Sequence, residues 1–219
     1  MDGTISDTWP WVGRLQRLVY DPTQKLTRKV TRAFLTGMRR RMSISDISRW
    51  RQDNSLHPSW EDRVEVMVSR IEPGSRILDI GAGAQSMRRH LPANCDYLPL
   101  DVVGRTPDTI VCDLNKGSLP SLRVDWAVAS GVLEYLVNVP RFLNELTSVS
   151  RQAVISYVVP QSGDSIFGRR AMGWVNDFTQ EEIEGKFLGC GFVIDDYKRW
   201  GGQMIYWLTV KSATNEDVR

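Results

Sequence analysis

The sequence has no apolar run that approaches the roughly 20 residues needed to cross a bilayer. Cysteine is also scarce: there are 3 in 219 residues, they form no CxxC pair, and they make no zinc-ligand spacing with the 2 histidines. We therefore expect reduced, partly buried thiols and no bound metal. Residues 1–11 lack the basic start and apolar stretch of a secretory signal, so we expect a cytoplasmic protein.

The overall composition is that of an ordinary globular chain. Charged residues make up 25% and hydrophobic residues 42%, which argues against disorder and repeats. The length suits one domain with a modest extension. Charge is distributed unevenly: residues 1–41 carry nine basic and three acidic side chains, and the remainder carries 19 and 23. The basic character is therefore confined to the first segment.

The N-terminal segment shows helical periodicity. Apolar residues recur at three-, four- and seven-residue steps over 12–42, which predicts an amphipathic helix interrupted near Pro22. Ser45 or Asp46 caps a further short helix through Trp50, residues 52–60 form a loop, and a helix follows over 60–71. We predict a helical extension or cap in residues 1–58 and a second domain in residues 59–219.

From residue 76 short apolar runs alternate with helical stretches. The expected strands are 76–80, 96–100, 109–112, 125–130, 153–158, 192–198 and 203–210. The expected helices cover about 85–91, 139–149 and 179–189, the last opened by a Thr179–Glu182 capping box. This order predicts an α/β fold: a doubly wound, mostly parallel seven-stranded sheet that ends in an antiparallel hairpin.

Polar residues gather where the expected strands end. Gly81-Ala82-Gly83 follows the first strand, and glycines there allow a tight turn and close approach of a ligand to the following helix. Asp101 ends the second strand at the position where nucleotide-binding sheets hold ribose hydroxyls. Asp113 and Leu114 follow the third strand, and Ser130-Gly131-Val132 follows the fourth. Because the carboxyl ends of parallel strands share one edge, these positions predict a nucleotide site.

Three observations indicate which nucleotide this site would hold. Ser86 occupies the place of the third glycine of a dinucleotide fingerprint, and the chain has no phosphate-binding P-loop. Asp79 directly precedes the glycine turn, where a carboxylate disfavours phosphate but suits a ligand with an amino group and a sulfonium. A ligand that contains adenosine and no phosphate fits these facts.

Residues 77–83, Asp101, Asp113 and the stretch DWAVASGVLEYL resemble class I S-adenosylmethionine-dependent methyltransferases over about residues 58–210. The resemblance implies a Rossmann-like fold with S-adenosylmethionine as cofactor. It assigns the methionine part to the glycine turn, the ribose to Asp101 and the adenine to Asp113. One departure is Gln85, where the family often has a third glycine. The implied cofactor-binding residues are Asp79, Gly81, Ala82, Gly83, Asp101, Val102, Asp113, Leu114, Ser130, Gly131 and Val132.

The absence of two motifs narrows the class of molecule that could accept the methyl group. No [ND]PP[YF] motif follows the fourth strand and no Pro-Cys nucleophile is present, which leaves an oxygen or nitrogen of a small-molecule or glycan-like acceptor. The candidate catalytic residues are Glu134, Tyr135, Tyr157 and His57, with packing roles as their alternative. Residues Asp164, Arg169, Arg170 and Trp174 lie in a long connection that is predicted to form an acceptor lid.

Three interpretations of the basic N-terminal segment are open. It can cap the active site, dock on an anionic membrane with Trp9 and Trp11 at the interface, or bind nucleic acid or a partner protein. A non-catalytic cofactor-binding module and a nucleic-acid methyltransferase recruited by this segment are the alternatives to a small-molecule methyltransferase. We expect nucleic acid to be the less favoured partner.

Overall fold

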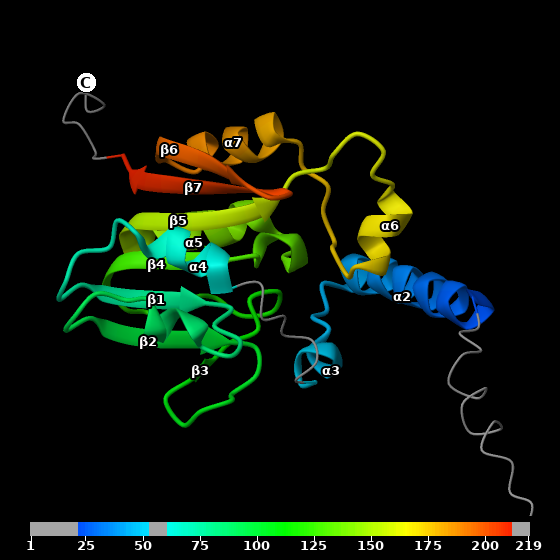
Figure 1. The fold of residues 1–219 in the computed structure, drawn as a ribbon, viewed down its shortest axis with the longest axis horizontal. Helices are drawn as coiled ribbons and strands as arrows, with labels where there is room; N and C mark the ends of the chain where they lie inside the picture. The colour runs from blue at the N-terminus through cyan, green and yellow to red at the C-terminus, as the bar shows by residue number, and fades with distance from the viewer. Residues whose placement is uncertain (1–21, 53–60, 212–219) are drawn as a thin grey trace, which may run out of the picture.

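The computed structural model describes residues 22–52 and 61–211 (Figure 1). They form a seven-stranded sheet in the order β3-β2-β1-β4-β5-β7-β6. The strands β1 to β5 are parallel, and β7 runs antiparallel to both β5 and β6. This confirms the predicted sheet and its C-terminal hairpin. The strands are β1 (Arg76–Ile80), β2 (Asp96–Asp101), β3 (Ile110–Val111), β4 (Val124–Ser130), β5 (Ser150–Val158), β6 (Phe192–Trp200) and β7 (Gln203–Val210).

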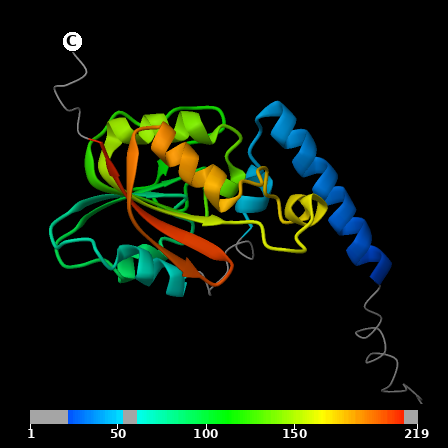
Figure 2. The same cartoon turned by 90° about the horizontal axis from the view of Figure 1, so that it is seen from above.

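Helices cover both faces of the sheet because its buried strands carry apolar side chains on both faces (Figure 2). Leu78 packs in the same apolar cluster as α5 (Val139–Val149) and α7 (Gln180–Gly189). Its neighbour Ile77 packs on the other face with α4 (Glu61–Val68). The predicted capping box of α7 is present, since Thr179 Oγ1 accepts from the Glu182 amide at 3.2 Å. These two layers hold the carboxyl ends of the parallel strands in place.

The N-terminal segment forms helices beside this body. Helix α2 (Pro22–Met42) begins at the proline that was predicted to interrupt it; residues 12–21 of the predicted helix lie outside the described residues. The Asp46 side chain caps α3 (Ile47–Trp50), as predicted, by accepting from the Arg49 amide at 3.3 Å. Helix α6 (Ile166–Ala171), which was not predicted, packs against α2.

The predicted helix over 85–91 is wrong. The chain forms only a short 3-10 turn there, η3 (Ser86–Arg89), preceded by Gln85 in the left-handed conformation at φ 56°. The Gln85 side chain is buried and donates to Thr106 Oγ1 at 2.6 Å and Thr109 Oγ1 at 3.2 Å. This tertiary contact replaces helical continuation. The expected contribution of an α-helix N-terminus behind the glycine turn is therefore absent.

Two composition-based expectations can be compared with the described residues. The thiols of Cys95, Cys112 and Cys190 are free and half-buried, as predicted. Among the helices of residues 22–52 and 61–211, none is both long and apolar enough to pass through a membrane.

Candidate functional site

A cavity of about 500 Å³ opens at the carboxyl ends of the parallel strands. This volume falls in the range of ligand pockets, about 300–1,000 Å³. All eleven residues that the sequence assigned to cofactor binding line it, so the structure brings them together. They are Asp79, Gly81, Ala82, Gly83, Asp101, Val102, Asp113, Leu114, Ser130, Gly131 and Val132.

The glycine turn forms the floor of the cavity. Gly81 has φ +74°, and a Cβ on it would lie 2.5 Å from Val132 Cγ2. A side chain at this position would therefore be strained and would collide with the loop after β4. Gly83, with φ +51°, donates its amide to Asp101 Oδ2 at 2.8 Å. The turn thus fixes the direction of the carboxylate that follows β2.

Asp79 is a buried carboxyl group at the same edge. It is 3% exposed, and the Tyr97 hydroxyl donates to its Oδ2 at 2.6 Å. Burial raises the pKa of Asp79 to about 7, the Tyr97 hydrogen bond lowers it, and the charge of Asp101 raises it. A cationic ligand group beside Asp79 would offset the burial of its charge. The electrostatics therefore favour an ammonium or sulfonium over a phosphate, as the sequence indicated.

The two acidic residues after β2 and β3 differ in how they are paired. Asp101 Oδ1 accepts from the Val103 amide at 2.9 Å and lies 3.7 Å from the Arg105 guanidinium. Asp113 Oδ1 accepts from Ser45 Oγ at 2.5 Å and from the Asn115 amide at 3.1 Å. Asp113 Oδ2 is buried and has no hydrogen-bond partner within residues 22–52 and 61–211. Such an oxygen is free to accept a hydrogen bond from a water molecule or a ligand.

Arg63 is a cavity residue that the sequence analysis missed. It lies on α4, is 4% exposed, and donates to Ser130 Oγ at 3.0 Å and to Gln203 Oε1 at 2.7 Å. Burial lowers the pKa of Arg63, and the negative charge of Glu134 partly offsets this. The sequence does carry a signal for Arg63. This cation stands four residues before Met67, so it falls on the apolar face of the predicted helix, where a charged side chain is unusual.

Two of the catalytic candidates line the cavity. Glu134 is 1% exposed; its Oε1 accepts from the Val158 amide at 2.8 Å, and its Oε2 has no hydrogen-bond partner in the described part of the chain. Burial raises the pKa of Glu134. The Tyr135 hydroxyl accepts from Trp174 Nε1 at 3.3 Å, and burial raises the Tyr135 pKa too. Of these two groups, Glu134 is the better proton acceptor.

The other two catalytic candidates are placed differently. Tyr157 is fully buried outside the residues that line the cavity. Its hydroxyl donates to Asn176 Oδ1 at 2.8 Å and accepts from the Phe178 amide at 3.0 Å, an arrangement that suits a packing role. His57 lies outside the described residues, so its proposed role stays a prediction.

The N-terminal segment covers the cavity beside the sheet edge. Arg49 donates to the Met172 carbonyl at 2.6 Å and stacks 4.8 Å from the Trp50 ring centroid. The Trp50 and Tyr135 rings meet edge to face at 4.9 Å, and all three side chains line the cavity. The structure therefore supports the interpretation of this segment as a cap, and it adds an aromatic wall that the sequence analysis did not identify.

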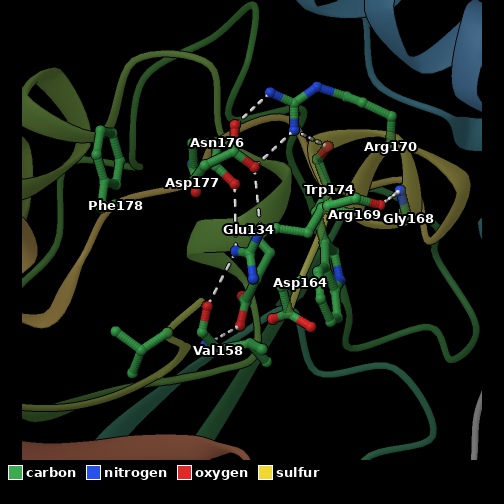
Figure 3. A network of polar contacts seen from close by, with 12 residues as sticks. Glu134, Val158, Asp164, Gly168, Arg169, Arg170, Trp174, Asn176, Asp177 and Phe178 are labelled. Atoms are coloured by element: carbon green, nitrogen blue, oxygen red, sulfur yellow. Dashed lines mark hydrogen bonds and ion pairs between the residues drawn. The ribbon is translucent and has the colours of Figure 1, made fainter. Parts of the chain in front are cut away.

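A buried ionic network lies within the predicted lid segment and reaches the end of β5, where Arg169 donates to the Val158 carbonyl at 3.0 Å (Figure 3). Arg169 Nε donates to Asp177 Oδ1 at 3.0 Å, and Arg170 donates to Asp177 Oδ2 at 2.5 Å. The Arg169 guanidinium also lies 4.8 Å from the Trp174 ring centroid. Trp174 lines the cavity, whereas Asp164 and the two arginines do not. The arginines thus position the lid rather than contact a ligand.

Comparison with known proteins gives matches in structure only. No family model matches the chain, and no curated protein matches it in sequence. The 1,6-didemethyltoxoflavin-N1-methyltransferase of Burkholderia thailandensis, solved with 1,6-didemethyltoxoflavin and S-adenosylhomocysteine (SAH), is 13% identical with a TM-score of 0.56; the match covers 97% of this chain and 94% of that one. A proposed O-methyltransferase from Nostoc punctiforme is 13% identical with a TM-score of 0.63, over 84% of this chain and 69% of that one.

A third similar structure is CalO1, a methyltransferase of calicheamicin biosynthesis in its SAH-bound form. It is 17% identical with a TM-score of 0.55, over 70% of this chain and 54% of CalO1. The chain therefore spans about half the length of CalO1. At these identities the similarity shows the fold. That fold is the one shared by S-adenosylmethionine-dependent methyltransferases, as the sequence resemblance implied.

The ionic network should make the free energy of unfolding depend on pH. Hydrogen bonds and charges from Arg170 and Arg169 lower the pKa of Asp177, although burial alone would raise it. Asp177→Asn should lower the free energy of unfolding at pH 7 by roughly 1–3 kcal/mol, less than for a fully buried pair because Asp177 is partly exposed. A lowered carboxyl pKa stabilises the fold above the ordinary value near pH 4, so the difference should shrink below about pH 4. Urea unfolding at pH 7 and pH 3 measures both effects; an equal difference at the two pH values would contradict this account.

The buried carboxyl group of Asp79 should cost stability in the ligand-free protein. Because its folded pKa is raised to about 7, stability falls as pH rises from about 4 to 7 and then levels off. Asp79→Asn should therefore raise the free energy of unfolding at pH 8 by roughly 2–4 kcal/mol and change it much less at pH 4. Glu65→Gln, which changes an exposed acid on α4, is the matched control. A destabilising effect of Asp79→Asn at pH 8 would show that this carboxylate already has sufficient partners.

Proposed function

We propose that this protein is an S-adenosylmethionine-dependent methyltransferase that modifies an oxygen or nitrogen of a small molecule. The single observation that carries the proposal is the unpartnered Asp113 Oδ2 in a cavity that also contains Asp79 and Asp101. An adenine amino group would supply the missing donor to Asp113, ribose hydroxyls would donate to Asp101, and an amino group or sulfonium would lie near Asp79. The three carboxylates match three different parts of one cofactor.

The cavity also fits the anionic end of this cofactor. Arg63 lines the cavity beside Gly131, where a Cβ would lie 3.2 Å from its guanidinium nitrogens. A guanidinium is suited to a carboxylate because both groups are planar and can form paired hydrogen bonds. We therefore assign the carboxylate of the methionine part to Arg63. This assignment gives a role to the buried guanidinium of Arg63 in a cavity that also contains three aspartates.

When bound, the cofactor supplies an electrophilic methyl group for in-line displacement by an acceptor atom. The side chains of this protein exclude water and handle the proton. Glu134 lines the cavity, its buried Oε2 has no hydrogen-bond partner in the described part of the chain, and burial raises its pKa, so this group is suited to take a proton from an acceptor O–H or N–H. Tyr135, Trp50 and Trp174 form an aromatic wall on which a flat small molecule or the apolar face of a sugar would pack.

Two of the similar solved structures support a small-molecule acceptor. The Burkholderia thailandensis enzyme is named for methylation of 1,6-didemethyltoxoflavin, and CalO1 is named for calicheamicin biosynthesis. The first name gives a small-molecule acceptor, and the second gives the biosynthesis of a small molecule.

Cofactor binding tests the first part of the proposal. Asp101→Ala should weaken S-adenosylmethionine or SAH binding about 10–100-fold, because a charge-assisted hydrogen bond contributes about 1.5–3 kcal/mol. Isothermal titration calorimetry measures the loss, and thermal denaturation checks that the variant is folded. Asp108→Ala removes an exposed acid from a nearby loop and should bind as the wild type does. Absence of binding by the wild type at millimolar cofactor would contradict the proposal.

Turnover tests the second part. Glu134→Gln preserves the acceptor for the Val158 amide but removes the proton-accepting carboxylate. It should lower methyl transfer about 10²–10⁴-fold while leaving cofactor affinity within a few fold. The measurement is transfer of label from methyl-labelled cofactor into a metabolite extract, quantified for the wild type and the variant. Equal transfer by both would remove Glu134 from the reaction, and cofactor binding without any transfer would indicate a non-catalytic module.

A further inference from the structure

Helix α2 presents an apolar face to solvent. Leu26, Val30, Phe34 and Met38 recur every four residues and are 60%, 48%, 67% and 43% exposed. At about 100° of rotation per residue these positions cover one side of the helix. Thr36, which is buried, and Arg39, which is half-buried, fall on the opposite side. The helix thus packs through one side, near its C-terminal end, and leaves an apolar side exposed.

A neighbouring element also carries exposed apolar side chains. Helix α6 packs against α2 and carries Ile166 and Phe167, which are 67% and 46% exposed. Single exposed apolar residues are common on protein surfaces, but a repeat along one helix face together with an adjacent pair is not. Such a surface indicates an interaction site.

The charge of α2 distinguishes between the possible partners. Its 21 residues contain seven lysines and arginines and no acidic residue. A second copy of the chain would bring two such helices together and repel strongly. Nucleic acid would contact cations, but here apolar side chains occupy the outward face. A bilayer with anionic lipids accommodates both features, since apolar side chains enter the interface while basic side chains reach the phosphates.

We propose that the outward face of α2 docks this protein on the surface of an anionic lipid bilayer, with the helix lying in the plane of the interface. Leu26, Val30, Phe34 and Met38 would enter the boundary between headgroups and acyl chains. Exposed cations on this side and at its edge, Arg41 and Arg40, would contact lipid phosphates. The proposal does not depend on the methyltransferase activity, because none of these residues lines the cavity.

Vesicle sedimentation of the full-length protein tests this proposal. The protein should sediment with vesicles of phosphatidylcholine and phosphatidylglycerol, remain in solution with phosphatidylcholine alone, and be released by high salt. Val30→Asp should reduce the bound fraction at least about tenfold in partition coefficient. Leu188→Asp is the matched control, because Leu188 on α7 is 50% exposed and Val30 is 48% exposed. It should bind vesicles as the wild type does.

The electrostatic part has its own pair of variants. Arg41→Glu should lower binding to the anionic vesicles about tenfold, whereas Arg123→Glu, an equal charge change at an exposed position directly before β4, should leave it nearly unchanged. Circular dichroism and thermal denaturation confirm that all four variants are folded. Since every substituted side chain lies on the surface, no large loss of stability is expected.

Three outcomes would overturn the proposal. Equal binding to neutral and anionic vesicles would exclude the electrostatic contribution, and unchanged binding by Val30→Asp would exclude this helix face. A dimer in sedimentation-equilibrium experiments that Val30→Asp dissociates would assign the face to a second copy of the chain. Salt-sensitive binding to RNA without any vesicle binding would assign it to nucleic acid.

Discussion

The cavity depends on one close approach between two loops. The glycine turn after β1 passes so near the loop after β4 that a Cβ on Gly81 would overlap the Val132 side chain. Because the turn is this tight, the Gly83 amide reaches Asp101 and fixes the orientation of its carboxylate. Asp79 is buried beneath the same turn, where a charge is costly unless a cation lies next to it. The shape and the electrostatics of the cavity therefore have a common origin.

The parts of the fold that follow local rules could be predicted from the sequence. Two-residue apolar alternation and buried runs located the strands, and the Thr179–Glu182 pair located the start of α7. The turn at η3 could not be predicted, because Gln85 is held by hydroxyl groups of Thr106 and Thr109, about twenty residues further along the chain. Helix propensity depends on neighbouring residues in the sequence, so it cannot reveal contacts with residues this far along the chain. The same limit applies to α6, a short helix that is held by packing against α2.

The residues of the site likewise divide into those that the sequence could predict and those that it could not. Residues at strand ends were predictable because parallel strands place their carboxyl ends at one edge, so Asp79, Asp101 and Asp113 had to lie near one another. Arg63 lies before the first strand, and its helix turns it toward this edge only through packing of Val64 and Met67 on the sheet. Tyr157 illustrates the reverse error. It lies near the end of a strand like the others, yet the alternation of side chains turns it to the opposite face, where Asn176 holds its hydroxyl.

The two proposed activities use opposite sides of helix α2. Thr36 and Arg39 line the cavity near the end of the helix, while Phe34 and Met38 point outward within the same two turns. Helix α6 and the network of Arg169, Arg170 and Asp177 tie this helix to the body. An outward substitution such as Val30→Asp changes no cavity residue, and Asp101→Ala changes no outward residue. The proposed cofactor recognition and the proposed membrane docking therefore depend on separate side chains of one structure, so each can be tested without disturbing the other.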